Sequence, residues 1–306
     1  MRRTTAAAVI LGMVAAACAR SEASEQERPR LVPMSGGVQV LNGESWEPVS
    51  DEVELGPDMQ VRVGRSSRAR LELPAGQTLE LARDARVAVD DVLAPKVLAG
   101  SVLAYADQGL TLDVESFKVF GRQSVFRVDL SLPQRVAVYE GAATLPGSGW
   151  ESPVGALQQV GVIAGAVLRG PQPLQVRPDD PWDIRLLSEA IDVGAGLLRQ
   201  ETGLGRQLAG DRVRTAILRA LGDEVGEDEL ADLLDEAGAA EVVVAAVVAM
   251  TAGRPDLGTA IAEILELRRL GASWFVVAQR FGVSRTVLTS VTEVVGRILD
   301  TVERLE

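Results

Sequence analysis

The sequence of 306 residues contains no histidine and only one cysteine. Histidine is the usual general base and the commonest metal ligand near neutral pH, so Ser-His-Asp and Cys-His catalytic arrangements are excluded. Zinc sites of the usual Cys and His composition are excluded as well. A metal would need oxygen ligands, and the acidic stretch 226–229 lacks the alternating ligands and central glycine of a calcium loop. We therefore expect no metal and no cofactor.

Lysine is also scarce, and the overall charge is negative. Of the 31 basic residues only two are lysines, the formal net charge is −12, and the isoelectric point is near 4.7. A chain of this charge repels phosphate backbones, so it lacks the electrostatic attraction that supplies most of the affinity for nucleic acid. We expect no nucleic-acid partner.

Carboxylates leave one enzymatic alternative open. The doublets Asp90-Asp91 and Asp179-Asp180 could supply the acid and base of a carboxylate-dependent hydrolase of the glycosidase type. Aspartates in such doublets more often serve as turn and helix-cap residues. We therefore predict that the protein is not an enzyme and keep the hydrolase as an alternative.

The single cysteine, Cys18, directly follows a short uncharged segment. Arg2 and Arg3 precede an apolar run over 4–14, and three alanines at 15–17 complete the layout of a secretory signal peptide. The run is shorter than the roughly 20 apolar residues that span a bilayer. A thiol directly after small residues resembles the lipobox of bacterial lipoproteins, which implies cleavage before Cys18 and its lipidation.

An ordinary signal peptide with an incidental cysteine is the alternative interpretation. A lone thiol has no disulfide partner and would be reactive in an oxidising compartment, which favours acylation of Cys18. The lipoprotein resemblance implies a triacylated cysteine, which anchors a protein stably. Ala19 replaces the aspartate that commonly retains such proteins at the inner membrane. The resemblance therefore implies an exported protein on the periplasmic side of the outer membrane, if the cell has two membranes.

Composition divides the chain into five parts. After the signal peptide (1–17), a polar stretch (18–35) is predicted to be a lipidated tether. Alternating short runs predict a β domain (36–170), four prolines mark a linker (171–182), and helical periodicity fills the rest (183–306). The expected fold class is α+β in two segregated domains: an N-terminal all-β sandwich, roll or short solenoid, and a C-terminal all-α bundle.

Short alternating runs separated by Gly, Pro and Asp predict the strands of the β domain. The pair Asn42-Gly43 predicts a hairpin turn after the first of them. Along each run one face is apolar and the other carries Arg, Glu or Asp, so we expect each sheet to bury one side and expose the other to water. The predicted strands are 38–41, 59–63, 69–73, 78–81, 86–89, 110–114, 126–130 and 135–139.

Two segments, 64–73 and 121–130, share the pattern G-R-x-S-x-x-R-apolar-acid-L. The glycine permits a tight turn, and the serine can hydrogen-bond to its own backbone before a strand begins. We interpret the segments as equivalent turns of a β architecture. The alternative is a paired arginine site, formed by Arg70 and Arg127, that contacts an anionic ligand or a partner, although arginines on strands are usually solvated.

Two stretches of the β domain contain motifs of a known family. Residues 55–81 show Leu-Gly-Pro-Asp-x-x-Val, Ser-Arg-Ala before a strand, and Ala-Gly-x-x-Leu-x-Leu, and residues 119–141 show Gly-Arg, Phe-x-Val and Val-x-Val-x-Glu-Gly. These motifs resemble the FecR-like domain of bacterial envelope proteins, although Pro57 interrupts the family's Gly-Asp pair, Ala75 replaces its aspartate and Arg122 its threonine.

The FecR-like resemblance covers roughly residues 36–170 and implies β turns and pleats without a catalytic site. Domains of this family occur in signal-relaying and scaffolding proteins of the envelope. The founding type regulates a sigma factor through a cytoplasmic tail and a membrane span. The sequence shows neither of these, so we do not expect that mechanism here.

Beyond Trp182 the apolar period becomes helical, and glycines or prolines near the expected helix ends act as stops. The segment 242–250 is apolar on all sides but only nine residues long, which predicts a buried core helix and not a membrane span. The expected helices are 183–201, 210–222, 227–237, 239–252, 256–270, 273–281 and 284–305.

One helical segment, 273–291, resembles a helix-turn-helix. Ala278 allows close packing in the first helix, and Gly282 makes the turn. This pattern predicts two packed helices, whereas DNA readout needs polar and basic side chains on the second helix. That helix offers Arg285 and no further basic residue before Arg297. A cytoplasmic DNA-binding regulator that uses this segment is an alternative, and it would require that the protein is not exported.

These observations predict a lipid-anchored envelope protein that acts as a non-enzymatic interaction, scaffolding or sensing module. It is expected to reach the membrane through acylated Cys18, and its other partner is expected to be an envelope protein or glycan. The two alternatives are the cytoplasmic DNA-binding regulator and the carboxylate-dependent hydrolase.

Overall fold

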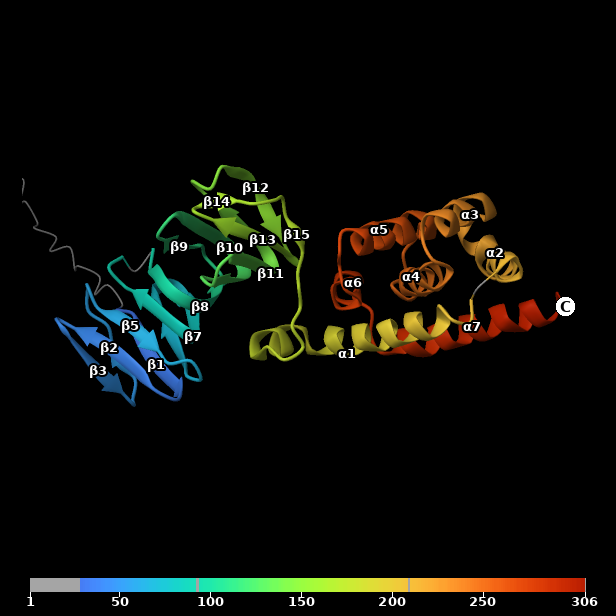
Figure 1. Ribbon diagram of the computed structural model, residues 1–306. Coiled ribbons are helices and arrows are strands. Elements are labelled where there is room, and N and C mark those ends of the chain that lie inside the picture. The colour runs from blue at the N-terminus through green and yellow to red at the C-terminus, as the bar shows by residue number, and fades with distance from the viewer. Residues whose placement is uncertain (1–27, 92–93, 209, 306) are drawn as a thin grey trace, which may run out of the picture.

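The computed structural model describes residues 28–91, 94–208 and 210–305. Within these ranges the chain forms an N-terminal β region followed by a helical region (Figure 1). This confirms the predicted α+β class with two segregated parts. The predicted signal peptide and Cys18 lie outside the described residues.

In the described residues fifteen strands form one sheet, in which almost all pairs are antiparallel. The strands are β1 (Arg30–Ser35), β2 (Val38–Asn42), β3 (Ser45–Val49), β4 (Val53–Glu54), β5 (Gln60–Val63), β6 (Arg68–Glu72), β7 (Thr78–Ala88), β8 (Lys96–Ala106), β9 (Leu110–Val114), β10 (Phe117–Asp129), β11 (Gln134–Leu145), β12 (Trp150–Gly155), β13 (Gln158–Ile163), β14 (Ala166–Val167) and β15 (Gln172–Pro173). The order of neighbours is β14-β13-β11-β10-β9-β8-β7-β5-β2-β3, with the other strands paired beside this path.

The sheet curls around one apolar core. Strands β8, β9 and β10 pair with one another in a closed cycle, which requires the longer strands to bend. The enclosed core includes Leu71, Leu81, Phe126 and Val138, all of them buried. Of the three predicted forms, this arrangement is closest to a roll.

The β region begins earlier than the sequence predicted. Residues 30–35, assigned to the tether, form β1, which pairs with β6 and places Leu31 in the core. The predicted tether (18–35) is polar over most of its length, and this conceals a short, more apolar strand at its end. The hairpin predicted at Asn42-Gly43 is confirmed, because Asn42 pairs with Ser45 and Gly43 has a φ of 63°.

The two repeated segments adopt different structures. In the first, Ser67 N donates to Gly64 O at 3.0 Å, which closes a turn between β5 and β6. The second lies within β10, where the register shifts and Gln123 has a φ of 48°. The prediction of two equivalent turns was therefore wrong for the second segment. Strands pair with β10 on both sides of this point, so the extra residues are accommodated as an irregularity within the strand.

Seven helices form the helical region within the described residues, close to the predicted ranges. No helix among these residues is both long enough and apolar enough to cross a membrane. The predicted core segment lies in a helix whose residues 242–249 are buried. The helices are α1 (Pro181–Leu204), α2 (Asp211–Val225), α3 (Glu227–Glu236), α4 (Ala239–Thr251), α5 (Leu257–Arg269), α6 (Trp274–Phe281) and α7 (Thr286–Glu303).

The predicted linker is docked on the sheet. Strand β15 pairs with β13, and Leu174 is buried. The Asp180 side chain accepts a hydrogen bond from Trp182 N and caps α1. The helix is interrupted at Leu187, whose φ is −130°, so its first turn lies against the β region while the remainder belongs to the helical region (Figure 1). We call residues 172–187 the junction segment.

Candidate binding site at the junction of the two regions

The junction segment covers a charged strip of the sheet. Glu80 of β7, Leu103 of β8, Arg127 of β10 and Ala137 of β11 are cross-strand neighbours in one row, and side chains in such a row lie on the same face. The alternation predicted this face to be in water. It is buried at its centre instead, because Trp182 packs against it, a cover that the β sequence alone does not show.

Arg127 lies at the centre of the buried charges. Its side chain is fully buried, Nε donates to Asp129 Oδ1 at 2.7 Å, and Nη1 donates to Asp180 Oδ2 at 2.9 Å. Its Nη2 has no hydrogen-bond partner among the described residues. The Trp182 ring centroid lies 4.9 Å from Cζ and supplies a cation–π contact. Two carboxylates thus compensate a charge that would otherwise be costly to bury.

These charges hold one another in the ionised state. Burial alone would raise the pKa of Asp129, but Arg127 and then Arg135 outweigh it and hold this pKa below its usual value. Burial acts against Asp180 too, and Arg127 together with the backbone N–H of Trp182 lowers its pKa. Burial opposes the charge of Arg127 as well, but Asp129 above all raises its pKa. Neither aspartate is suited to donate a proton near neutral pH.

Further hydrogen bonds attach the first turn of α1 to the sheet. Trp182 Nε1 and Arg185 Nη2 donate to Glu80 Oε2 at 2.9 and 2.8 Å. The Tyr139 hydroxyl donates to Asp183 Oδ1 at 2.5 Å. Burial, and next Asp183, raise the pKa of Tyr139 well above its usual value. The start of α1 therefore binds the sheet through four side chains, those of Asp180, Trp182, Asp183 and Arg185.

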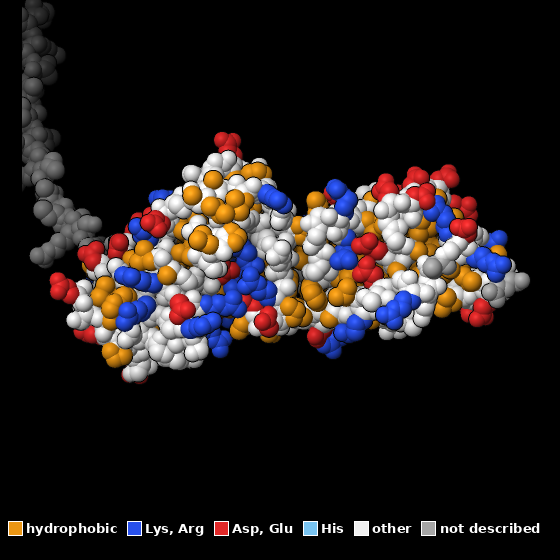
Figure 2. All heavy atoms as spheres, viewed as in Figure 1, with side chains coloured by type: hydrophobic (Ala, Val, Ile, Leu, Met, Phe, Trp, Pro, Cys, Tyr) orange, Lys and Arg blue, Asp and Glu red, His pale blue; other side chains and the backbone are white. Residues whose placement is uncertain are grey.

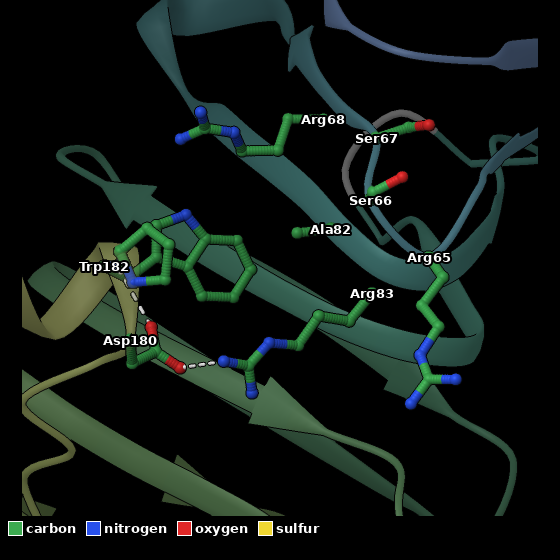
Figure 3. Close-up of a pocket in the computed structure, with 9 residues that line it drawn as sticks. Arg65, Ser66, Ser67, Arg68, Ala82, Arg83, Asp180 and Trp182 are labelled. Atoms are coloured by element: carbon green, nitrogen blue, oxygen red, sulfur yellow. Dashed lines mark hydrogen bonds and ion pairs between the residues drawn. The ribbon is translucent and has the colours of Figure 1, made fainter.

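A cavity of about 240 Å³ opens beside this network, and we call it the junction cavity (Figure 3). Three segments that are distant in the sequence build it: the turn between β5 and β6, the middle of β7, and the start of α1. In Figure 3 Trp182 lies between Arg68 on one side and Arg83 on the other. The lining residues are Arg65, Ser66, Ser67, Arg68, Ala82, Arg83, Asp180, Pro181 and Trp182.

Positive charge predominates in the junction cavity, which has three arginines and one aspartate in its wall. Arg83 Nη2 donates to Asp180 Oδ2 at 2.5 Å. Arg65 and Arg68 are exposed and make no hydrogen bond or ion pair with any described residue. Figure 2 shows basic side chains gathered where the β region meets the start of α1. The cavity can therefore attract an anion although the whole chain is acidic.

The two arginines singled out from the repeated segments are not brought together. Arg70 and Arg127 share one cross-strand row, but β7 and β8 lie between them, which at about 4.8 Å per strand separates their backbones by roughly 14 Å. Arg127 is buried and bound to carboxylates, whereas Arg70 is half-buried and has no hydrogen bond or ion pair among the described residues. They do not form a common site.

The carboxylate doublets have different surroundings. Asp180 is the N-cap of α1 and an ion-pair partner, as the cap interpretation predicted. Asp179, Asp90 and Asp91 are exposed. The junction cavity contains a single carboxylate, whereas glycosidases use a pair.

The segment that resembles a helix-turn-helix forms α6 and α7, with Gly282 in the left-handed conformation at a φ of 62°. The start of α7 packs against α1: Gln200 Nε2 donates to Leu288 O at 2.7 Å, and Arg285 forms an ion pair with Asp192. The basic residue offered for readout is thus paired with a carboxylate, although both side chains remain exposed. This arrangement favours a packing role for the segment.

Sequence reasoning missed the junction cavity. Arg65 and Arg68 belong to the first repeated segment, but the repeat pointed to Arg70 and Arg127 as the candidate pair. Arg83 stood outside any predicted strand. The sequence did contain one signal for this position. In Asp180-Pro181 an N-cap residue is followed by proline at the first helical position, and this pair marks the start of α1, which forms part of the cavity wall.

Comparison with protein-family models found no match for the sequence, and comparison with curated proteins found none either. Two crystal structures of a candidate anti-sigma factor from Parabacteroides distasonis, at 1.65 and 2.50 Å resolution, are distantly similar, each with a TM-score of 0.33 and 13% sequence identity. The similarity covers 38% of this chain and 60% of that protein, so it spans less than two thirds of the relative's length.

Proposed function

We propose that this protein is a non-enzymatic sensing or interaction module of the bacterial envelope, with a FecR-like β region, a helical region, and a lipid anchor at Cys18. The observation that carries the proposal is the junction segment. Its polar and charged side chains fasten the first turn of α1 to the sheet, and a basic cavity lies beside these contacts, where the β region meets the helical region. Such an arrangement can bind a ligand or partner, and binding there can change how the two regions are held relative to each other. The partner we propose is an envelope protein or glycan.

The state of the charged groups supports a role other than catalysis. Asp129 and Asp180 have lowered pKa values because their arginine partners outweigh the effect of burial. A catalytic acid needs a pKa raised towards the working pH. Asp129 and Asp180 are therefore suited to hold structure and not to transfer protons.

The surroundings of α7 favour the interaction module over DNA binding. Arg285 is paired with Asp192, and Leu288 packs closely against Gly196, where a Cβ would collide with its side chain. Inserting this end of α7 into a major groove would require α1 to move away.

Lipid anchoring is tested by metabolic labelling with a radioactive fatty acid in a bacterial host. We expect label on the wild type, its loss in Cys18→Ser, and its retention in the control Ala19→Ser, because only the thiol accepts the acyl chain. Fractionation should place the labelled protein in the membrane fraction. An unlabelled wild type in the soluble cytoplasm would refute the anchor and the envelope location together.

A further inference from the structure

Arg65 and Arg68 lie together in the wall of one hollow of this acidic chain. Some arginines of the chain are paired with carboxylates, for example Arg214 with Asp235 at 2.6 Å. The two arginines of the cavity wall have no such partner among the described residues, and a third, Arg83, uses one nitrogen for Asp180 and keeps further N–H donors. Three guanidinium groups from two chain segments thus line one hollow with little compensating charge.

The turn that presents Arg65 and Arg68 is held in place. Gly64 N donates to Gly37 O at 3.1 Å, and Ser67 N donates to Gly64 O at 3.0 Å. Ser67 is buried against Gly36, where any Cβ would collide with the serine hydroxyl. A fixed turn lowers the entropy lost when its side chains bind a ligand.

Besides three arginines, two serines and one aspartate, the cavity wall has an apolar part. Ala82, Pro181 and Trp182 form it, and the Trp182 ring is held by its hydrogen bond to Glu80 and by its contact with Arg127. The volume of about 240 Å³ lies below the usual range for drug-sized ligands. The cavity suits a small molecule or group with one charged end and one flat apolar part.

We propose that the junction cavity binds a small organic anion, in which a phosphate or carboxylate is attached to a flat apolar group. Arg65 and Arg68 donate charge-assisted hydrogen bonds to the oxyanion, Arg83 adds its remaining donors, and the apolar part lies against Trp182. This deepens the proposed sensing function by giving it a ligand class, and it does not depend on the lipid anchor.

Ligand binding at this position would act on the connection between the two regions. Arg65, Arg68 and Arg83 belong to the β region, whereas Pro181 and Trp182 belong to the first turn of α1. A ligand that contacts both sides stabilises the docked arrangement, since it binds the folded junction and not the separated one.

The test is calorimetric titration of the full-length protein in mild detergent with phenyl phosphate, inorganic phosphate, benzoate and phenol. We expect saturable binding of phenyl phosphate or benzoate at one site, weaker binding of inorganic phosphate, and no binding of phenol. Affinity should fall at least tenfold in the double variant Arg65→Gln/Arg68→Gln. The matched control Arg122→Gln changes the equivalent arginine of the second repeated segment, which lies outside the cavity, and should alter affinity less than twofold.

The phenyl phosphate and benzoate arms show which oxyanion the site prefers. A higher salt concentration should weaken binding, because the attraction is electrostatic. The proposal is overturned if neither aromatic anion binds, if phenol binds as well as phenyl phosphate, or if the double variant binds as tightly as the wild type. Any of these results leaves the fatty-acid labelling, and the envelope location that it tests, untouched.

Discussion

Arg127 and Arg68 both lie close to Trp182, yet one is buried and the other is exposed. Arg127 has two carboxylate partners and the face of the Trp182 ring. Arg68 lines the neighbouring cavity and has no partner among the described residues. The difference follows from the cost of desolvation: a charge without water needs compensation inside the protein, whereas a charge in water does not.

This comparison separates two uses of the same residue type. The buried arginine fixes the position of the junction segment, and a change there should affect folding. The exposed arginines of the cavity can bind a ligand, and substituting them should affect ligand binding but not folding. Four measurements test the separation, beginning with the largest expected effect.

Replacing Asp180 should cause the largest loss of stability. Asp180→Ala leaves Arg127 with one carboxylate and removes the cap of α1, and breaking such a buried pair costs about 3–5 kcal/mol. Urea unfolding followed by circular dichroism measures the change. The control is Asp179→Ala, an exposed neighbour without a described partner, which should stay within about 0.5 kcal/mol of the wild type. Equal effects of the two changes would refute the role given to Asp180.

Acid should weaken the junction through the same carboxylates. The pKa values of Asp129 and Asp180 are lower in the folded protein than the ordinary value of 3.8. Their contribution is therefore complete above about pH 4 and is lost as the pH falls through the folded values, by about 1.4 kcal/mol for each unit of pKa difference. Unfolding free energies measured from pH 7 to pH 2 should fall less steeply in Asp180→Ala than in the wild type. Parallel curves would contradict this account.

The two tyrosines should differ in their contribution to stability, as the buried Arg127 and the exposed Arg68 do. Tyr139 is buried and donates to Asp183, whereas Tyr105 is half-buried beside Arg185. Tyr139→Phe should cost about 1 kcal/mol for the lost hydrogen bond, and Tyr105→Phe should cost less. Burial raises the pKa of both hydroxyls. The stability that each protonated hydroxyl contributes is therefore present below pH 10 and is lost at higher pH. Ultraviolet titration of the wild type and of each variant measures the order, and Tyr139 should ionise last.

The smallest effect is expected at the cavity wall. Arg65→Gln/Arg68→Gln should change the free energy of unfolding by less than about 0.5 kcal/mol, because neither side chain has an internal partner. The same urea experiment measures it beside Arg127→Gln, which should be strongly destabilising. A large loss in the double variant would show that these arginines support the fold and would weaken the case for a ligand.

The helices were predictable to within a few residues because glycines mark their ends and their apolar period is regular. The strands were predicted less completely. β8 was missed since its sequence KVLAGSVLAYA does not alternate, and much of this strand is buried on both faces, where alternation is not required. β1 was missed because only Leu31 among its residues is fully enclosed.

The candidate site was out of reach of sequence reasoning for a different reason. Trp182 and Glu80 are 102 positions apart, and Arg127 and Asp180 are 53 apart. Local patterns identified a cap, a turn and a boundary rich in proline, all of which are present. They could not show that the boundary folds back onto the sheet, and this docking is what selects which arginines are buried and which remain available.

The interruption of α1 at Leu187 decides how the molecule can be divided. A cut within residues 171–182, where the prolines suggest it, would separate Trp182 from Glu80 and leave Arg127 buried with Asp129 alone. A fragment that ends after Leu187 keeps every contact between the first turn and the sheet. The best place to divide the chain therefore lies inside α1, after Leu187. A truncation placed at the prolines would remove contacts that the β region needs.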